Sequence, residues 1–224
     1  MIIDVLTLFP GMFRGFLESS IVRKAIEAKA INVYLTDIRD FAFNKHRQTD
    51  DYPYGGEAGM VMKPEPVYEA LRFLDMEDGC PVIYFTPQGR KLDQEVVREY
   101  ASVQRMVLLC GHYKEIDQRI RDKFVTDEIS LGDYIISGGE LASMIMIDAV
   151  ARLQDGVLND IASAQSDSFE DGELDCPYYT RPEVFLDMAV PDVLLSGDHK
   201  KIQKWRREQA KELTRKRRPD LMKS

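Results

Sequence analysis

Three apolar segments, each followed by a glycine turn, constrain the fold of this chain more than any other feature. The segments and their glycines are residues 81–85 with Gly89, residues 106–110 with Gly111, and residues 129–136 with Gly138 and Gly139. Short continuous apolar runs are typical of strands buried on both faces of a parallel sheet. Ligands bind in the crevice beyond the carboxyl ends of such strands. We therefore expect the three turns to converge on one pocket.

The third turn, Ser137-Gly138-Gly139-Glu140-Leu141, leads directly into an apolar helical pattern that continues to Val150. Because glycine lacks Cβ, its backbone can approach a ligand closely, and free N–H groups collect at the start of a helix. The pattern differs from the dinucleotide fingerprint Gly-x-Gly-x-x-Gly. It favours a nucleotide-type pocket, and it also fits a plain turn between a strand and a helix.

Strand-like and helix-like segments alternate over residues 1–154, which predicts an α/β domain with a parallel sheet. The expected strands are residues 2–9, 31–35, 82–85, 106–109 and a segment before Gly132. The expected helices are residues 10–25, 64–76, 94–103, 116–124 and a segment that ends near Leu153.

The rest of the chain has a different character. Residues 155–175 carry seven Asp and Glu side chains and no Lys or Arg, and their apolar periodicity is lost. This composition predicts a flexible acidic linker. Residues 176–224 are expected to form a small helical domain, with short helices at 182–188 and 199–213.

Charge is distributed unevenly along the chain. The formal net charge is −8. Between Lys200 and Arg218 ten Lys and Arg face Glu208 and Glu212, so this stretch carries +8 and the remainder −8 − 8 = −16. A basic face on an acidic body suits a nucleic-acid partner. A solvated helix with internal ion pairs is the alternative interpretation.

Composition excludes several other classes. Apolar residues make up 44% and charged residues 30% of the chain, as in an ordinary globular protein. No apolar run approaches the ~20 residues of a membrane helix, and Asp4 interrupts any signal-peptide pattern. Cys80, Cys110 and Cys176 are widely spaced, which favours free thiols in the cytoplasm over a zinc site.

A set of motifs, taken together, carries a resemblance to a known family. The motifs are residues 84–92, 110–113, 132–134 and 137–141, together with His46-Arg47, Asp50-Asp51 and residues 53–56, 167–169, 175–177, 179–184, 194–197 and 205–206. In this order the chain resembles the bacterial tRNA (guanine-N1)-methyltransferase family, TrmD, from its first residue to nearly its last. The resemblance implies a SPOUT fold with a deep trefoil knot, and a homodimer whose active site draws on both subunits.

The resemblance also implies the reaction. A methyl group passes from S-adenosylmethionine to N1 of guanosine at position 37 of tRNA, and neither a membrane nor DNA is a partner. Neutral guanine holds a proton on N1, so a general base must remove it. Asp167 matches the family's proposed base, and Arg152 matches an arginine that donates to guanine O6. By themselves, an Asp in an acidic segment is commonly only solvated, and an Arg ending a helix commonly complements the helix dipole.

Binding residues follow from the same match. The positions that match the cofactor site are Tyr84, Phe85, Pro87, Gly89, Gly111, Tyr113, Ser130, Leu131, Gly132, Asp133, Tyr134, Ile135, Ile136, Gly138, Gly139 and Leu141. The positions expected near tRNA are His46, Arg47, Asp50, Lys200, Lys201, Lys204, Arg206 and Arg207.

One departure from the family pattern concerns a metal ion. The usual Gly-Arg-Tyr-Glu-Gly-Ile-Asp reads here Gly-His-Tyr-Lys-Glu-Ile-Asp at residues 111–117. Lys114 therefore occupies the glutamate position that the family associates with Mg²⁺. Glu115 lies next to it, but adjacent side chains need not point the same way. The sequence leaves the Mg²⁺ requirement open and identifies no metal ligands.

Two further functions stay open. One is a SPOUT methyltransferase that acts on another RNA position, and the other is a catalytically silent RNA-binding protein. The motifs at residues 175–177 and 179–182 resemble the family's tRNA-binding half, which disfavours the first. Asp167 and Arg152 are both present, which disfavours the second.

Overall fold

The computed structural model describes residues 1–158, 167–169 and 172–222. The chain divides into two compact units, Met1–Asn159 and Asp160–Ser224. The expected linker, 155–175, falls partly on residues 159–166 and 170–171, which lie outside the described residues. At its start, Val157 is buried in the core of the first unit. At its end, the Leu174 N–H donates to the Thr214 hydroxyl of the second unit (2.8 Å).

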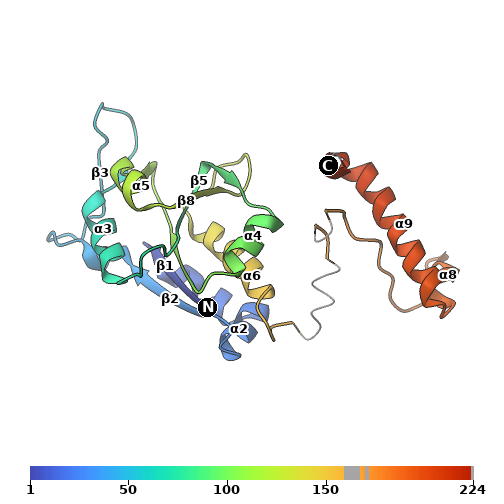
Figure 1. The fold of residues 1–224 in the computed structure, drawn as a ribbon. Helices are drawn as coiled ribbons and strands as arrows, with labels where there is room; N and C mark the ends of the chain where they lie inside the picture. Colours follow the sequence, from blue (N-terminus) through green and yellow to red (C-terminus); the bar gives the residue numbers. More distant parts are fainter. Residues whose placement is uncertain (159–166, 170–171, 223–224) are drawn as a thin grey trace. The chain divides into compact units, whose positions relative to one another are not determined.

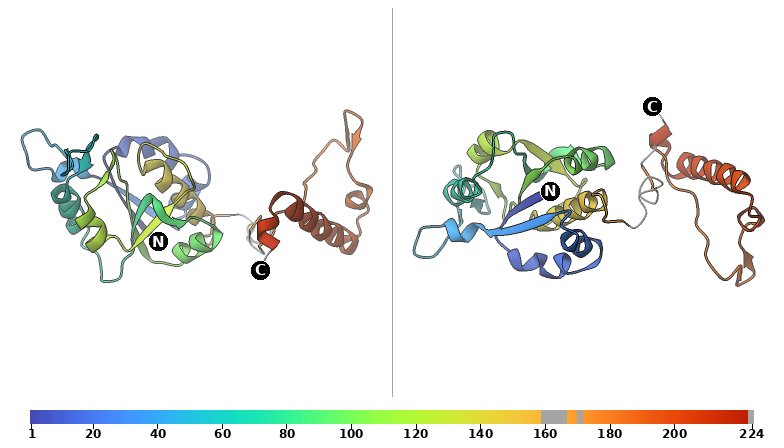
Figure 2. Two further views of the ribbon diagram at one scale, coloured as in Figure 1. Left: turned by 90° about the horizontal axis from the view of Figure 1, so that it is seen from above. Right: turned by 60° about the horizontal axis from the view of Figure 1, so that its bottom comes forward.

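Five parallel strands form the central sheet of the first unit (Figures 1 and 2). In spatial order they are β2 (Asn32–Asp37), β1 (Ile2–Thr7), β6 (Arg105–Leu109), β5 (Val82–Lys91) and β8 (Asp127–Ser130). This sheet confirms the α/β class that the alternation predicts.

Helices cover both faces of the sheet (Figure 1). One face carries α2 (Ser20–Glu27), α4 (Gln94–Ala101) and α6 (Glu140–Arg152), and the other carries η2 (Ile38–Phe41), α3 (Pro64–Phe73) and α5 (Gln118–Phe124). In β6, Met106 and Leu108 pack with the first layer, whereas Val107 and Leu109 pack with the second. Since both faces are buried, the strand sequence is continuously apolar rather than alternating.

Three expected helices differ in the first unit, one of them only in that α3 ends at Phe73 instead of residue 76. The helix expected over residues 10–25 is divided into η1 (Pro10–Phe13), α1 (Arg14–Leu17) and α2. The left-handed φ of 53° at Ser20 separates α1 from α2. The helix expected from Ile116 begins at Gln118, because the Asp117 side chain accepts the Arg119 N–H and caps it (2.9 Å). Ile116 instead belongs to a small second sheet of β3 (Asp50–Asp51), β4 (Val61–Met62) and β7 (Glu115–Ile116).

The second unit contains a hairpin where a helix was expected. Residues 182–188 include β9 (Val184–Phe185) and the start of β10 (Met188–Ala189), so the helix prediction is wrong there. Leu186 and Asp187 form the two-residue loop with φ of 48° and 60°, the left-handed geometry that two-residue hairpin loops favour. A right-handed helix cannot contain these two residues.

The other helix of the second unit is confirmed. After α8 (Asp192–Leu195), α9 (His199–Arg217) spans the expected 199–213 and extends beyond it, followed by η3 (Pro219–Met222). Asp198 caps α9 by accepting the N–H groups of Lys200 and Lys201 at 3.1 and 3.2 Å. Among the helices that the structure describes, none has both the length and the apolar content of a membrane span.

Candidate active site

The carboxyl ends of β5, β6 and β8 open into one pocket of about 240 Å³. Residues 84–88 lie within β5, residues 111–115 lie after β6, and residues 129–132 and 134–139 come from β8 and the turn into α6. The predicted convergence of the three glycine-bearing strand ends is therefore confirmed.

Two of these loops touch backbone to backbone. The Gly139 N–H donates to the Gly111 carbonyl at 2.8 Å, and His112 forms an isolated β-bridge with Gly138. A Cβ on Gly139 would lie 2.8 Å from Cα of Cys110, closer than real Cβ atoms approach. Glycine is required here because the two loops meet without space for a side chain.

Gly111 also leaves space for a buried tyrosine. A Cβ at Gly111 would lie 2.6 Å from the Tyr84 phenol oxygen. The Tyr84 side chain is buried, and its hydroxyl donates to the Glu115 carboxylate. Burial, followed by this carboxylate, raises the pKa of Tyr84 far above its usual range. Tyr84 therefore remains a neutral hydrogen-bond donor in the wall of the pocket.

A buried arginine connects the elements beneath the pocket. The Arg121 guanidinium of α5 is 7% exposed and donates to both carboxylate oxygens of Glu128, at 2.8 and 2.9 Å. It also donates to Gln88 Oε1 at 2.8 Å and forms an ion pair with Glu115 at 3.3 Å. Its Cζ lies 5.5 Å from the Tyr84 ring centroid. One cation thus ties together α5, β7, β8 and β5.

Comparison with known proteins identifies the family. Residues 1–224 match the family model described as tRNA (Guanine-1)-methyltransferase TrmD. The chain belongs to the TrmD family. A tRNA (guanine-N(1)-)-methyltransferase of Caldanaerobacter subterraneus subsp. tengcongensis is 51% identical, over 100% of this chain and 92% of that protein. Proteins of the same name are 52% identical in Alkaliphilus oremlandii, over 100% and 92%, and 52% identical in Staphylococcus haemolyticus, over 98% and 90%.

Most residues expected at the cofactor site of a TrmD protein line the pocket. They are Tyr84, Phe85, Pro87, Gly111, Tyr113, Ser130, Leu131, Gly132, Tyr134, Ile135, Ile136, Gly138 and Gly139. Gly89, Asp133 and Leu141 are not among the lining residues. Gly89 instead lies against the Glu128 backbone, where a Cβ would collide. Leu141 is half exposed on α6.

Sequence reasoning missed several lining residues. They are Thr86, Gln88, His112, Lys114, Glu115, Ile129, Ser137 and Ala142. Most lie directly beside a predicted position, so the continuity of each loop was the available signal. The centroids of the His112 and Phe9 rings lie 4.8 Å apart. Phe9 follows the carboxyl end of β1, and nothing in the local sequence around His112 indicates this contact.

Lys114 and Glu115 have different partners. The Lys114 ammonium forms an ion pair with Glu57, and this hydrogen bond and charge lower the pKa of Glu57. Glu115 instead accepts the Tyr84 hydroxyl and pairs with Arg121. Among the described residues, no three His, Cys, Asp or Glu side chains gather in a way that could hold a metal ion. The described side chains thus offer Mg²⁺ no ready-made carboxylate cluster.

The two candidate catalytic residues lie in different places. Arg152 ends α6, whereas the pocket borders the first turn of this 13-residue helix. At 1.5 Å per residue, about 15 Å of helix separates Arg152 from Ala142, the last α6 residue that lines the pocket. Asp167 belongs to the second unit. There burial raises the pKa of Asp175, and the nearby Asp167 carboxylate raises it further.

The residues expected near tRNA also divide between the units. In the first unit, His46 and Arg47 are exposed, Arg47 pairs with Asp40, and Asp50 lies in β3. In the second, all the expected cations are exposed on α9: Lys200, Lys201, Lys204, Arg206 and Arg207. Lys200, Lys204 and Arg207 share one helix face with Lys211.

The close approach at Gly111 generates a stability prediction. Gly111→Ala should lower the free energy of unfolding by about 1–3 kcal/mol, because the new methyl group must displace the Tyr84 ring. Gly15→Ala is the matched control, since its Cβ would meet nothing within 4 Å inside α1. It should leave stability unchanged or raise it by up to about 1 kcal/mol. Urea denaturation measures both; equal stability of the two variants would refute the packing argument.

Proposed function

We propose that this protein transfers the methyl group of S-adenosylmethionine to N1 of guanosine at position 37 of tRNA. The products are 1-methylguanosine and S-adenosylhomocysteine. The observation that carries the proposal is membership of the TrmD family over residues 1–224, joined to a pocket built from the family's glycine-bearing strand ends.

The pocket has the chemistry that S-adenosylmethionine requires. Adenine is an apolar disc with polar edges, which apolar walls and backbone polar groups accommodate. Phe85, Leu131 and Ile136 supply apolar wall. Gly111 and Gly138 have no side chains that could cover the backbone polar groups at the pocket. We assign cofactor binding to these residues and to the other lining positions that match the family.

The chain's own residues would carry out proton removal and charge stabilisation. Bound S-adenosylmethionine supplies the methyl group, and the electron pair of the broken S–CH3 bond stays on sulfur. Asp167 accepts the N1 proton, which frees the N1 lone pair to form the N–CH3 bond. Arg152 donates to O6, where negative charge accumulates once N1 has lost its proton.

We further propose that the active site forms between two copies of the chain in the knotted SPOUT fold. About 15 Å of α6 separates Arg152 from Ala142, the last α6 residue that lines its own pocket. We therefore assign the arginine at each pocket to a second copy of the chain. The uncovered side of α6 supports this, because Leu141 and Ile145 are 50% and 48% exposed while the other side is core. Nearby apolar side chains left exposed include Met12 and Ile135.

Transfer RNA would bind through the basic face of α9 and through His46, Arg47 and Asp50. Phosphate contacts from lysine and arginine release counterions, so such binding weakens as salt rises. We place the reaction in the cytoplasm, where the free thiols of Cys80, Cys110 and Cys176 stay reduced.

The function is tested by methyl transfer from labelled S-adenosylmethionine into an unmodified tRNA transcript. A transcript with guanosine at position 37 should yield 1-methylguanosine, and a transcript with adenosine there should not. Incorporation that persists in the adenosine transcript would point to another RNA position. Saturable S-adenosylmethionine binding without any incorporation would indicate a silent binder.

The same assay addresses the metal. Lys114 already places a positive charge where the family pattern has glutamate, and its ammonium is held by Glu57. We therefore expect transfer to continue in EDTA, with spermidine present to keep the tRNA folded. Loss of activity in EDTA, restored by Mg²⁺, would contradict this expectation.

The role of Asp167 is tested by Asp167→Asn. Removal of the general base should slow methyl transfer by roughly 10²-fold or more while S-adenosylmethionine and tRNA binding persist. The matched control is Asp155→Asn, an exposed acid at the start of the acidic segment, which should retain activity. A rate within threefold of wild type would remove Asp167 from the role of base.

The basic face of α9 is tested by the salt dependence of tRNA binding. Replacement of five exposed cations with Ala should weaken binding and lower the salt slope by about 1 for each phosphate that the variant no longer neutralises. The five are Lys200, Lys201, Lys204, Arg206 and Arg207. Arg14→Ala with Arg23→Ala, exposed cations of α1 and α2, forms the control. An unchanged slope in the α9 variant would place the RNA face elsewhere.

A further inference from the structure

One wall of the pocket is a segment that leaves the sheet and returns to it. β5 pairs with β8 in two registers, because Ile129 is the partner of Phe85 and again of Arg90. The four residues between them, 86–89, have no partners in β8. Thr86, Pro87 and Gln88 line the pocket. The shape of this wall is therefore determined by what holds its two ends.

Contacts at Gln88 and Gly89 hold the second half of the segment. Gln88 accepts a hydrogen bond from Arg121 at 2.8 Å. Gly89 lies so close to the Glu128 backbone that a Cβ would collide with it. The segment is thus pressed against β8 just before the chain re-enters the sheet.

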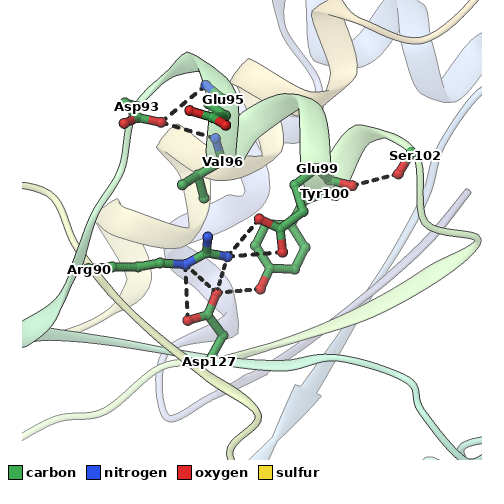
Figure 3. Close-up of polar contacts among 8 residues, drawn as sticks. All are labelled: Arg90, Asp93, Glu95, Val96, Glu99, Tyr100, Ser102 and Asp127. Atoms are coloured by element: carbon green, nitrogen blue, oxygen red, sulfur yellow. Dashed lines mark hydrogen bonds and ion pairs between the residues drawn. The ribbon is translucent and has the colours of Figure 1, made fainter.

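Arg90 holds the returning end (Figure 3). Its Nε and Nη2 donate to Asp127 Oδ2 at 2.9 and 2.6 Å, and Nη2 also donates to Glu99 Oε2 at 2.9 Å. The Tyr100 hydroxyl donates to the same Asp127 oxygen at 2.5 Å. Figure 3 shows the Arg90 side chain extending from β5 toward Glu99 and Tyr100 of α4 and Asp127 of β8.

This network fixes the orientation of the Arg90 side chain more than it stabilises the fold. The Arg90 side chain is 43% exposed, and the Glu99 side chain 52%, and exposed ion pairs contribute little to folding free energy. A guanidinium that binds two carboxylates, however, has one preferred orientation because its donors form a rigid planar fork. Loss of Arg90 should therefore release the wall more than it destabilises the fold.

We propose that Arg90 is a positioning residue that holds the 86–89 wall in place for S-adenosylmethionine. Arg90 is not among the residues that line the pocket; it acts through Thr86, Pro87 and Gln88. The inference rests on the proposed function, because it assigns S-adenosylmethionine to this pocket.

The test measures S-adenosylmethionine binding by calorimetry and methyl transfer by steady-state kinetics. Arg90→Gln should raise the dissociation constant and the KM for S-adenosylmethionine about 10-fold, with kcat and the KM for tRNA within about twofold of wild type. Arg90→Lys keeps the charge but loses the planar fork of donors. Its dissociation constant and KM for S-adenosylmethionine should therefore lie between those of the wild type and of Arg90→Gln. Tyr100→Phe removes one hydrogen bond to Asp127 and should give a smaller rise in the same KM.

Arg72→Gln is the matched control. Arg72 pairs with Glu69 at 3.3 Å on α3, and neither residue lines the pocket. This variant should bind S-adenosylmethionine as wild type does, which separates wall positioning from the general loss of an ion pair.

The outcomes are distinguishable. Binding by Arg90→Gln within twofold of wild type, or a fall in kcat as large as the change in KM, would overturn the proposal. If Arg90→Gln does not fold, Tyr100→Phe decides, and an unchanged KM for S-adenosylmethionine in that variant would overturn it. Failure of the proposed function looks different, since the wild-type protein would itself bind no S-adenosylmethionine or transfer no methyl group.

Discussion

The hydrogen bond from the Gly139 N–H to the Gly111 carbonyl is the constraint on which the rest of the site depends. It joins the loop after β6 to the start of α6 at a distance that admits no side chain. The same closeness sets the position of Tyr84, whose phenol occupies the space beside Gly111. A pocket between these loops exists because Gly111, Gly138 and Gly139 allow the backbones to meet.

Two arginines, Arg121 of α5 and Arg90 of β5, hold the part of β5 that forms another wall of the pocket. Arg121, almost completely buried, balances the carboxylates of Glu115 and Glu128 while it holds Gln88. Arg90 fixes the place where the chain returns to the sheet. Among the described residues, no buried side-chain nitrogen or oxygen lacks a hydrogen-bond partner. Low-dielectric surroundings make such complete pairing necessary, and they make the resulting geometry rigid.

Much of this could be predicted from local pattern, and the rest could not for identifiable reasons. Continuous apolar runs indicate doubly covered strands, so β6 and residues 82–85 of β5 were predictable. The continuation of β5 to Lys91 was not, because residues 86–91 carry no apolar run. Ile116 reads as helix because its strand pairing with Met62 comes from residues 54 positions away. The left-handed loop at Leu186 and Asp187 was not predictable because it places Leu186, a residue type that seldom adopts this conformation, at its first position. Gly89 reads as a pocket residue, yet its role is a contact between strands.

The central claim is that the three strand ends form the S-adenosylmethionine pocket and that a second copy completes it. A crystal structure of the full-length protein with S-adenosylhomocysteine tests both parts at once. We predict the nucleoside against residues 84–88, 111–115 and 130–139 of one chain, with Arg152 of another copy nearest the sulfur. A ligand bound outside these loops, or an Arg152 from the same chain at the sulfur, would contradict the account.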